Sequence, residues 1–156
     1  MDIKIGQLCH PAVIQLLTEH HQDMLRHSPE ESVHALDLSA LSAANVCFWT
    51  LWDQDKLAGC GALKDLGDGH GEIKSMRTAQ QYLRCGVART LLQHIIEYAK
   101  NKGYQRLSLE TGTMTAFIPA HQLYQAQGFE TCPPFGDYQV DPYSTFMTKK
   151  LVKSTD

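Results

Sequence analysis

The stretch from Glu72 to Lys102 reads EIKSMRTAQQYLRCGVARTLLQHIIEYAKNK. Residues 72–78 predict a strand, and the part from Gly86 onward predicts an amphipathic helix that stops at Gly103. This helix has one polar side and one side of small and aliphatic residues, namely Ala88, Leu91, Leu92, Ile95 and Ala99. A strand that leads through a short turn into such a helix is typical of a sheet covered by helices.

The segments on both sides of this stretch continue the alternation. Alternating or β-rich runs predict further strands at 3–5, 45–52, 57–66, 105–111, 129–132 and 144–151. Helices are predicted from Pro11 to His27, over 30–41, and between Pro119 and Gly128. This order predicts a mixed sheet with an antiparallel early hairpin and a parallel pair in the second half, where a helix crosses over.

The same pattern assigns residues to the core. On the first helix, the predicted buried stripe consists of Ile14, Leu17, His21 and Met24. The second helical segment offers Val33, Leu36 and Leu38 for burial. Trp49 and Trp52 are expected to point to opposite faces of the sheet, because they lie three residues apart in one strand.

Length and composition favour a single globular domain over residues 1–156. The chain has 156 residues, 43% of them hydrophobic, and 14 Lys plus Arg against 17 Asp plus Glu, which gives a net charge of −3. The absence of basic runs argues against nucleic acid or an anionic membrane as partner. No apolar run of about 20 residues and no leader pattern is present, so we expect a cytoplasmic protein. Five cysteines without a CxxC pair indicate reduced thiols.

The turn before the long helix, residues 80–88, is the first candidate binding site. The leading N–H groups of a helix have no intrahelical partner, and the helix dipole is positive there, so a glycine turn at Gly86 lets a phosphate approach. Arg84 and Arg89 are placed to add charged contacts. No Gly-Lys-Ser/Thr follows, and the second and third glycines of a dinucleotide fingerprint are absent. A glycine that merely permits a tight turn remains the alternative.

Three segments in order resemble the GNAT N-acetyltransferases. Residues 72–78 and 83–92 resemble the acetyl-CoA binding core of that family, and Leu123–Phe129, LYQAQGF, is similar to its LYxxxGF segment. The runs LSLETG (107–112) and PPFGDY (133–138) resemble a bacterial subgroup of small acetyltransferases. Leu83 departs from the family, which usually has Gln or Arg there. The resemblance covers nearly the whole chain and implies the α/β (α+β) GNAT fold, with about seven strands, helices on both faces and splayed parallel strands.

The resemblance implies transfer of an acetyl group from acetyl-CoA to an amine of a small molecule or peptide, by direct attack in a ternary complex. It makes Glu72 the expected base, directly or through a water, and Tyr124 the expected proton donor to the departing thiolate. Two alternatives to these catalytic roles stay open. Glu72 is then an ordinary carboxylate at a strand edge, and Tyr124 is an aromatic residue that packs on the apolar face of its helix. A non-catalytic acyl-CoA-binding regulatory module on the same fold is the alternative function.

The resemblance also implies the residues around each ligand. The expected coenzyme contacts are Met76, Arg77, Thr78, Arg84, Cys85, Gly86, Val87, Ala88 and Arg89. Glu110 is a second candidate for the base or an acceptor anchor, and Asp137 or Asp141 is expected to attract a cationic amine. The segments 28–41 and 135–139 are expected to line the acceptor pocket, and a homodimer is the default expectation.

Two further clusters have plain explanations. His20, His21, His27 and His34 lack the spacing of a tetrahedral Cys/His site, so no metal is predicted and a solvated or substrate-facing helix surface is favoured. Cys85 beside the phosphate turn is predicted to pack rather than to react, because direct transfer needs no enzyme nucleophile.

Overall fold

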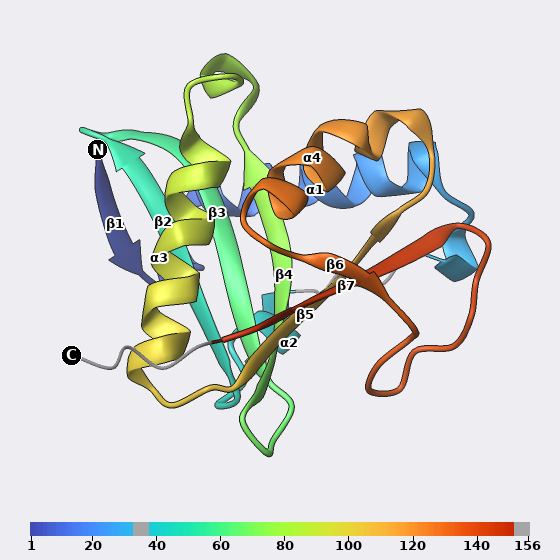
Figure 1. The fold of residues 1–156 in the computed structure, drawn as a ribbon. Coiled ribbons are helices and arrows are strands. Elements are labelled where there is room, and N and C mark those ends of the chain that lie inside the picture. Colours follow the sequence, from blue (N-terminus) through green and yellow to red (C-terminus); the bar gives the residue numbers. More distant parts are fainter. Residues whose placement is uncertain (33–37, 152–156) are drawn as a thin grey trace.

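Among residues 1–32 and 38–151, which the computed structural model describes, seven strands form one mixed sheet in the order β1-β2-β3-β4-β5-β7-β6 (Figure 1). The strands are β1 (Asp2–Ile5), β2 (Val46–Asp53), β3 (Lys56–Asp65), β4 (His70–Thr78), β5 (Arg106–Gly112), β6 (Glu130–Cys132) and β7 (Ser144–Lys150). The helices are α1 (Pro11–His27), α2 (Leu38–Leu41), α3 (Val87–Asn101) and α4 (Ile118–Ala126). The predicted mixed sheet and its helices on both faces are confirmed.

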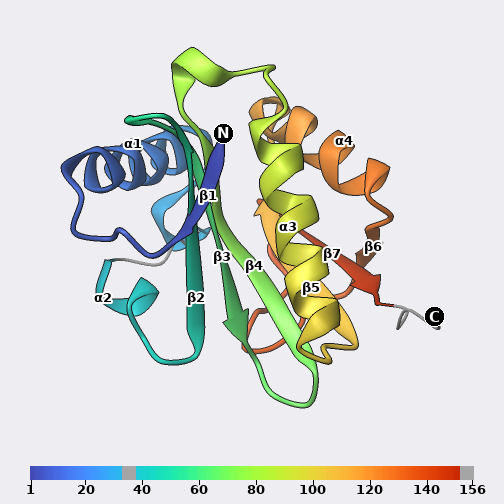
Figure 2. The same cartoon turned by 90° about the vertical axis from the view of Figure 1, so that its left-hand side faces the viewer.

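The two faces of the sheet carry separate cores. Figure 2 shows α1 and α2 on one face and α3 and α4 on the other. Trp49 is buried in the cluster under α3, and Trp52 is buried in the cluster under α1 and α2, so the prediction that they face opposite sides is confirmed. No described helix is long and apolar enough to cross a membrane.

Helix α1 packs in a different register from the predicted stripe. Val13 and Leu16 are the buried residues, while Ile14 is 38% exposed and His21 is exposed; of the predicted stripe, Leu17 is partly buried against the same cluster. Both registers satisfy a period of about 3.6, and the fit of Val13 and Leu16 against the sheet decides between them. As a result His20, and not His21, lies with Met24 toward the sheet.

Only the two ends of the second predicted helix lie within the described residues. Within 30–41 the structure describes a 3₁₀ turn at Glu30–Ser32 and α2, and Leu38 is 38% exposed rather than buried. Leu41 is the residue of α2 that is buried against β2. Val33 and Leu36 lie outside the described residues.

Strands β4 and β5 run parallel and then part. Their pairing ends at Ile73 and Leu109, although both strands continue beyond that point. The pairing of β3 with β4 also shifts register between Cys60 and Ala62, opposite Ser75, whose φ of 56° is left-handed. The parting strands and this bulge position the candidate site.

Candidate functional site

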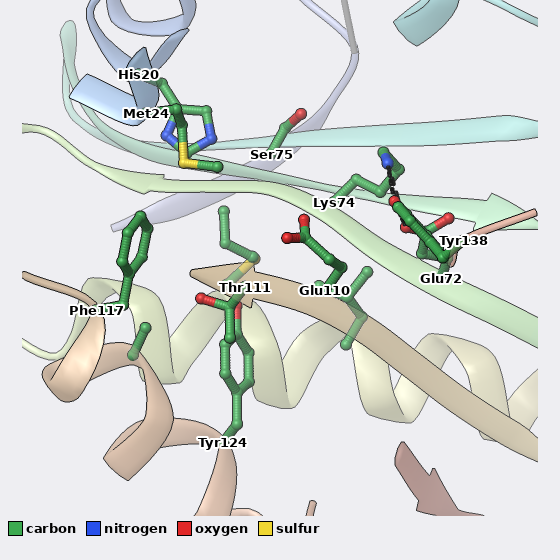
Figure 3. A pocket seen from close by; sticks show the side chains of 13 residues that line it. His20, Met24, Glu72, Lys74, Ser75, Glu110, Thr111, Phe117, Tyr124 and Tyr138 are labelled. Atoms are coloured by element: carbon green, nitrogen blue, oxygen red, sulfur yellow. Dashed lines mark hydrogen bonds and ion pairs between the residues drawn. The ribbon is translucent and has the colours of Figure 1, made fainter. Parts of the chain in front are cut away.

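A cavity of about 120 Å³ lies where β4 and β5 part (Figure 3). Small-molecule pockets commonly measure roughly 300 to 1,000 Å³, so this cavity has room for the reacting ends of ligands rather than for whole ones. Its walls come from α1, β4, β5, the 3₁₀ turn before α4, α4 and the loop before β7. The lining side chains include His20, Met24, Glu72, Lys74, Ser75, Met76, Glu110, Thr111, Phe117, Tyr124 and Tyr138.

Glu72 is buried, with 3% of its surface exposed, and its charge is matched within the wall. Lys74 Nζ lies 3.1 Å from Glu72 Oε2, and the Tyr138 hydroxyl donates to the same oxygen at 2.5 Å. Lys74 also donates to the Tyr138 hydroxyl oxygen at 2.8 Å. Burial and the Glu72 carboxylate raise the pKa of Tyr138, so its hydroxyl stays a donor. The Glu72 carboxylate is therefore paired with Lys74 and hydrogen-bonded by Tyr138.

Glu110 extends from β5 directly after the pairing with β4 ends. The Ser144 hydroxyl donates to its Oε2 at 2.8 Å. Burial raises the pKa of Glu110 to about 7, helped by the nearby carboxylates of Glu72 and Asp141, while Ser144 and Lys74 act in the opposite direction. A carboxyl group with a pKa near neutrality can exchange a proton under ordinary conditions.

Helix α1 contributes His20 and Met24 to the opposite wall. Burial, with help from the Arg77 guanidinium, lowers the pKa of His20 to about 4, so the ring is neutral at pH 7. Arg77 itself pairs with Asp23 of α1, its Nη2 2.5 Å from Asp23 Oδ2. This predicted coenzyme residue is thus tied by its side chain to α1. Within residues 1–32 and 38–151, no group of three or more His, Cys, Asp or Glu is placed to hold a metal ion, and His34 lies outside those ranges.

Tyr124 reaches the cavity from the other face of the sheet. It belongs to the core under α3 and α4, is 7% exposed and packs edge-on against Phe129 with ring centres 5.7 Å apart. Burial raises its pKa, so the hydroxyl is protonated at neutral pH. Glu72 and Glu110 alternate with core residues Ile73 and Leu109, and so they point to the α1 side. The gap between β4 and β5 therefore has the carboxyl groups of Glu72 and Glu110 on the α1 side and the Tyr124 phenol on the α4 side.

The turn before α3 has the geometry of an open anion site. Arg84 and Gly86 have φ values of 64° and 79°, and no side chain caps the helix. The first N–H groups of α3, those of Val87, Ala88 and Arg89, have no intrahelical acceptor. Leu83, Arg84, Gly86 and Arg89 are exposed. Cys85 is also exposed, so the prediction that it packs is wrong.

Sequence reasoning missed some of the lining residues and misplaced others. Asp137 is exposed and does not line the cavity, while the adjacent Tyr138 does. Asp141 accepts a hydrogen bond from Ser32 at 2.6 Å, which joins the predicted 28–41 segment to the chain just after the predicted 135–139 segment. Lys74 has a signal in the sequence, because it lies two residues after Glu72 on one strand and so shares its face. In the sequence, His20 stands out only as one of four histidines on a predicted solvated or substrate-facing surface, and it is the one of these that lines the cavity among the described residues.

Sequence relatives of this chain are N-acetyltransferases. The profile of the Acetyltransferase (GNAT) family matches residues 11–129. The uncharacterized N-acetyltransferase YsnE of Bacillus subtilis is 56% identical over 151 residues, which cover 97% of this chain and 100% of the relative. The uncharacterized N-acetyltransferase YedL of Escherichia coli is 50% identical over 154 residues, which cover 99% of this chain and 97% of the relative.

Solved structures share the fold. A proposed acyl-CoA N-acyltransferase from Klebsiella pneumoniae is 28% identical with a TM-score of 0.79, covering 97% of each chain. A Bacillus subtilis acetyltransferase in complex with CoA has a TM-score of 0.67 at 19% identity, covering 96% of this chain and 98% of the other, and shows likeness of fold alone. The chain therefore belongs to the GNAT family of acetyltransferases and is an acyltransferase.

Proposed function

We propose that this protein transfers the acetyl group of acetyl-CoA to a primary amine by direct attack within a ternary complex. The observation that carries the proposal is the parting of β4 and β5 after Ile73 and Leu109, with Glu110 on one side of the gap and Tyr124 on the other. An amine on the α1 side and a thioester on the α4 side would meet in this gap.

The coenzyme is proposed to lie with its diphosphate on the turn before α3. The N–H groups of Val87, Ala88 and Arg89 and the positive end of the helix dipole favour a phosphate there, and the exposed Arg84 and Arg89 add charge. Exposed Leu83 leaves the main-chain groups accessible, although it supplies no charge itself. The CoA complex of the structural neighbour supports this class of ligand.

The pantetheine arm is proposed to follow the unpaired part of β4 toward the cavity. Met76 lines the cavity, and Thr78 lies at the end of β4 beside the turn. The β4 main chain between them has no β5 partner, so its polar groups are available to a ligand on that side. Fixed N–H groups there would stabilise the oxyanion formed by attack on the thioester carbon.

Glu110 is proposed as the base, in place of Glu72. An alkylammonium ion has a pKa of about 10.4 and must lose a proton before its nitrogen attacks. Glu110 has a pKa of about 7 and a free approach from the cavity, whereas Glu72 is engaged by Lys74 and Tyr138. Glu72 then serves as the anchor that fixes Lys74 and the Tyr138 loop.

Tyr124 is proposed as the acid. When the nitrogen–carbon bond has formed, the carbon–sulfur bond breaks and the electron pair stays on sulfur. The Tyr124 phenol gives its proton to that thiolate, while Glu110 has taken the proton of the amine. The products are an acetamide and the free thiol of CoA. The nitrogen loses a second proton as the amide forms, and this proton returns through solvent to the Tyr124 phenolate, while Glu110 releases its proton to water.

The test is release of CoA thiol from acetyl-CoA with a panel of primary amines, compared with the Glu110→Gln variant. We expect amine-dependent thiol release that the variant loses by about 10²-fold or more. Thiol release without amide formation, or none with any amine, would contradict the proposal.

A further inference from the structure

Ser75 is a buried residue whose hydroxyl has no hydrogen-bond partner. It is 9% exposed, and its Oγ is one of two buried side-chain polar atoms without a partner in residues 1–32 and 38–151, the other being Arg77 Nε. Its backbone also adopts the left-handed φ of 56°, which is unfavourable for a non-glycine residue. An unpaired buried hydroxyl and local strain at one position are typical of a site that is completed by a ligand.

The bulge places this hydroxyl on the α1 side of the cavity. Ile73 and Met76 pack against the core under α3, so the side chains of Lys74 and Ser75 between them are left for the other face. Figure 3 shows Ser75 on the side of β4 from which His20 and Met24 reach. Ser75 therefore lies on the side of the gap that holds Glu110.

The charges on the α1 side of the cavity disfavour the binding of an anionic ligand group next to Ser75. Lys74 is balanced by Glu72, and the Arg77 guanidinium by Asp23. His20 is neutral at pH 7, and within residues 1–32 and 38–151 Glu110 is hydrogen-bonded by the neutral Ser144 hydroxyl rather than paired with a cation. The negative charge of ionised Glu110 therefore dominates this side of the cavity. A ligand group that takes the Ser75 hydrogen must be an oxygen without a negative charge.

We propose that Ser75 donates its hydroxyl hydrogen to an uncharged carbonyl oxygen next to the reacting nitrogen, so that the acceptor is an α-amino amide and not a free amino acid. This inference rests on the proposed function. The amine then faces Glu110, the neighbouring carbonyl faces Ser75, and a carboxylate in place of that carbonyl would be repelled by Glu110. An amino acid amide and a peptide N-terminus share this chemistry.

The experiment uses three matched acceptors that differ at one group: leucinamide, leucine and 3-methylbutylamine. Thiol release with acetyl-CoA at pH 8 gives kcat/KM for each, referred to the concentration of unprotonated amine, because an α-amino group (pKa about 8) and an alkylamine (pKa about 10.4) are ionised to different extents. We expect leucinamide to exceed the plain amine by about tenfold, the value of one hydrogen bond made to a previously unpaired donor. Leucine should fall below the plain amine by roughly tenfold or more. A leucine-initiated dipeptide in parallel distinguishes a peptide N-terminus from a free amide as the source.

Two variants remove the hydroxyl in different ways. Ser75→Ala keeps a Cβ, whereas Ser75→Gly also relieves the left-handed backbone, so one of them remains informative where the other folds poorly. Either should lower kcat/KM for leucinamide about tenfold and for 3-methylbutylamine much less, which removes the preference. Ser42→Ala, at an exposed serine, is the control that should keep it.

Equal kcat/KM for amide and amine, or a preference that survives both variants, would overturn the inference and leave the proposed function intact. If no acceptor is acetylated, the proposed function fails, and calorimetric binding of the same three compounds to the protein loaded with CoA still decides. Tighter binding of leucinamide that Ser75→Gly abolishes supports the role of Ser75. Equal affinities contradict it.

Discussion

The Tyr138 hydroxyl donates a hydrogen bond of 2.5 Å to Glu72 Oε2 across 66 positions of the chain. This contact brings the loop between β6 and β7 onto the wall of the cavity and satisfies a buried carboxylate. Tyr138 is also in ring contact with Phe135 and Phe146, at 5.2 and 5.4 Å between ring centres. The loop is thus held at Tyr138 both by hydrogen bonds with Glu72 and Lys74 and by aromatic contacts.

Tyr138→Phe should therefore destabilise the fold. The aromatic contacts remain, but Glu72 loses a donor while it stays buried, which costs about 2 kcal/mol for a hydrogen bond to a charged group. Urea unfolding measures the change. Tyr143→Phe, at a residue 39% exposed, is the matched control and should change the free energy of unfolding by no more than about 0.5 kcal/mol. Equal losses in the two variants would contradict the role of the contact.

The pH dependence of turnover should report Glu110. A base must be deprotonated to act. On the acidic limb of the pH profile, kcat/KM should therefore rise as the pH passes through about 7, and this rise should be complete once Glu110 is ionised. Ser144→Ala removes a hydrogen bond that favours the carboxylate, so the limb should move to higher pH. Glu72→Gln is the comparison: if it, and not Glu110→Gln, removes the limb, the base is Glu72.

Glu110 should also make the protein less stable at alkaline pH. Its pKa is about 7 in the fold against an ordinary 4.5, so the folded state holds the proton more tightly between these values. The stabilising contribution is complete below pH 4.5 and is lost as the pH rises through 7. Relative to the wild type, Glu110→Gln should gain about 3 kcal/mol between pH 4 and pH 8. Unfolding curves for both proteins at these two pH values measure the gain, and an unchanged difference would refute it.

The fold could be predicted from local patterns because its main elements carry strong ones. Helix α3 has a clear apolar side and a glycine at each end, and both limits are confirmed within one residue. The parting of β4 and β5 could be expected only through the family resemblance, since no local property of Ile73 or Leu109 ends their pairing.

The wall of the site could not be predicted as well, for two physical reasons. On α1, two apolar stripes one residue apart fit the same period, and only packing on the sheet chooses the one that brings His20 inward. Tyr138 reaches Glu72 from a loop without periodicity, and loop conformation depends on contacts far along the chain. The choice between Glu72 and Glu110 depended on which carboxyl Lys74 neutralises, and that is a property of the assembled fold.

Tyr124→Phe should separate proton donation from coenzyme binding. The ring and its contact with Phe129 are kept, and only the hydroxyl is lost. We expect kcat to fall about 10²-fold, while the dissociation constant of acetyl-CoA changes less than about twofold. Tyr104→Phe, at a partly buried tyrosine outside the cavity, is the control. Normal turnover in Tyr124→Phe would leave Tyr124 a packing residue.

Gly86 and Gly103 offer a matched test of the phosphate turn, because they flank the two ends of α3. Both have left-handed φ values, 79° and 88°, and a Cβ added at either meets nothing within 4 Å. Alanine at either position should therefore cost a similar amount of stability, about 1 kcal/mol. At Gly86 the new methyl group and the relaxed backbone also disturb the N–H groups of Val87 and Ala88. The dissociation constant of acetyl-CoA, measured by calorimetry, should then rise on the order of tenfold in Gly86→Ala and stay unchanged in Gly103→Ala. If both variants bind the coenzyme equally well, the diphosphate does not lie on this turn.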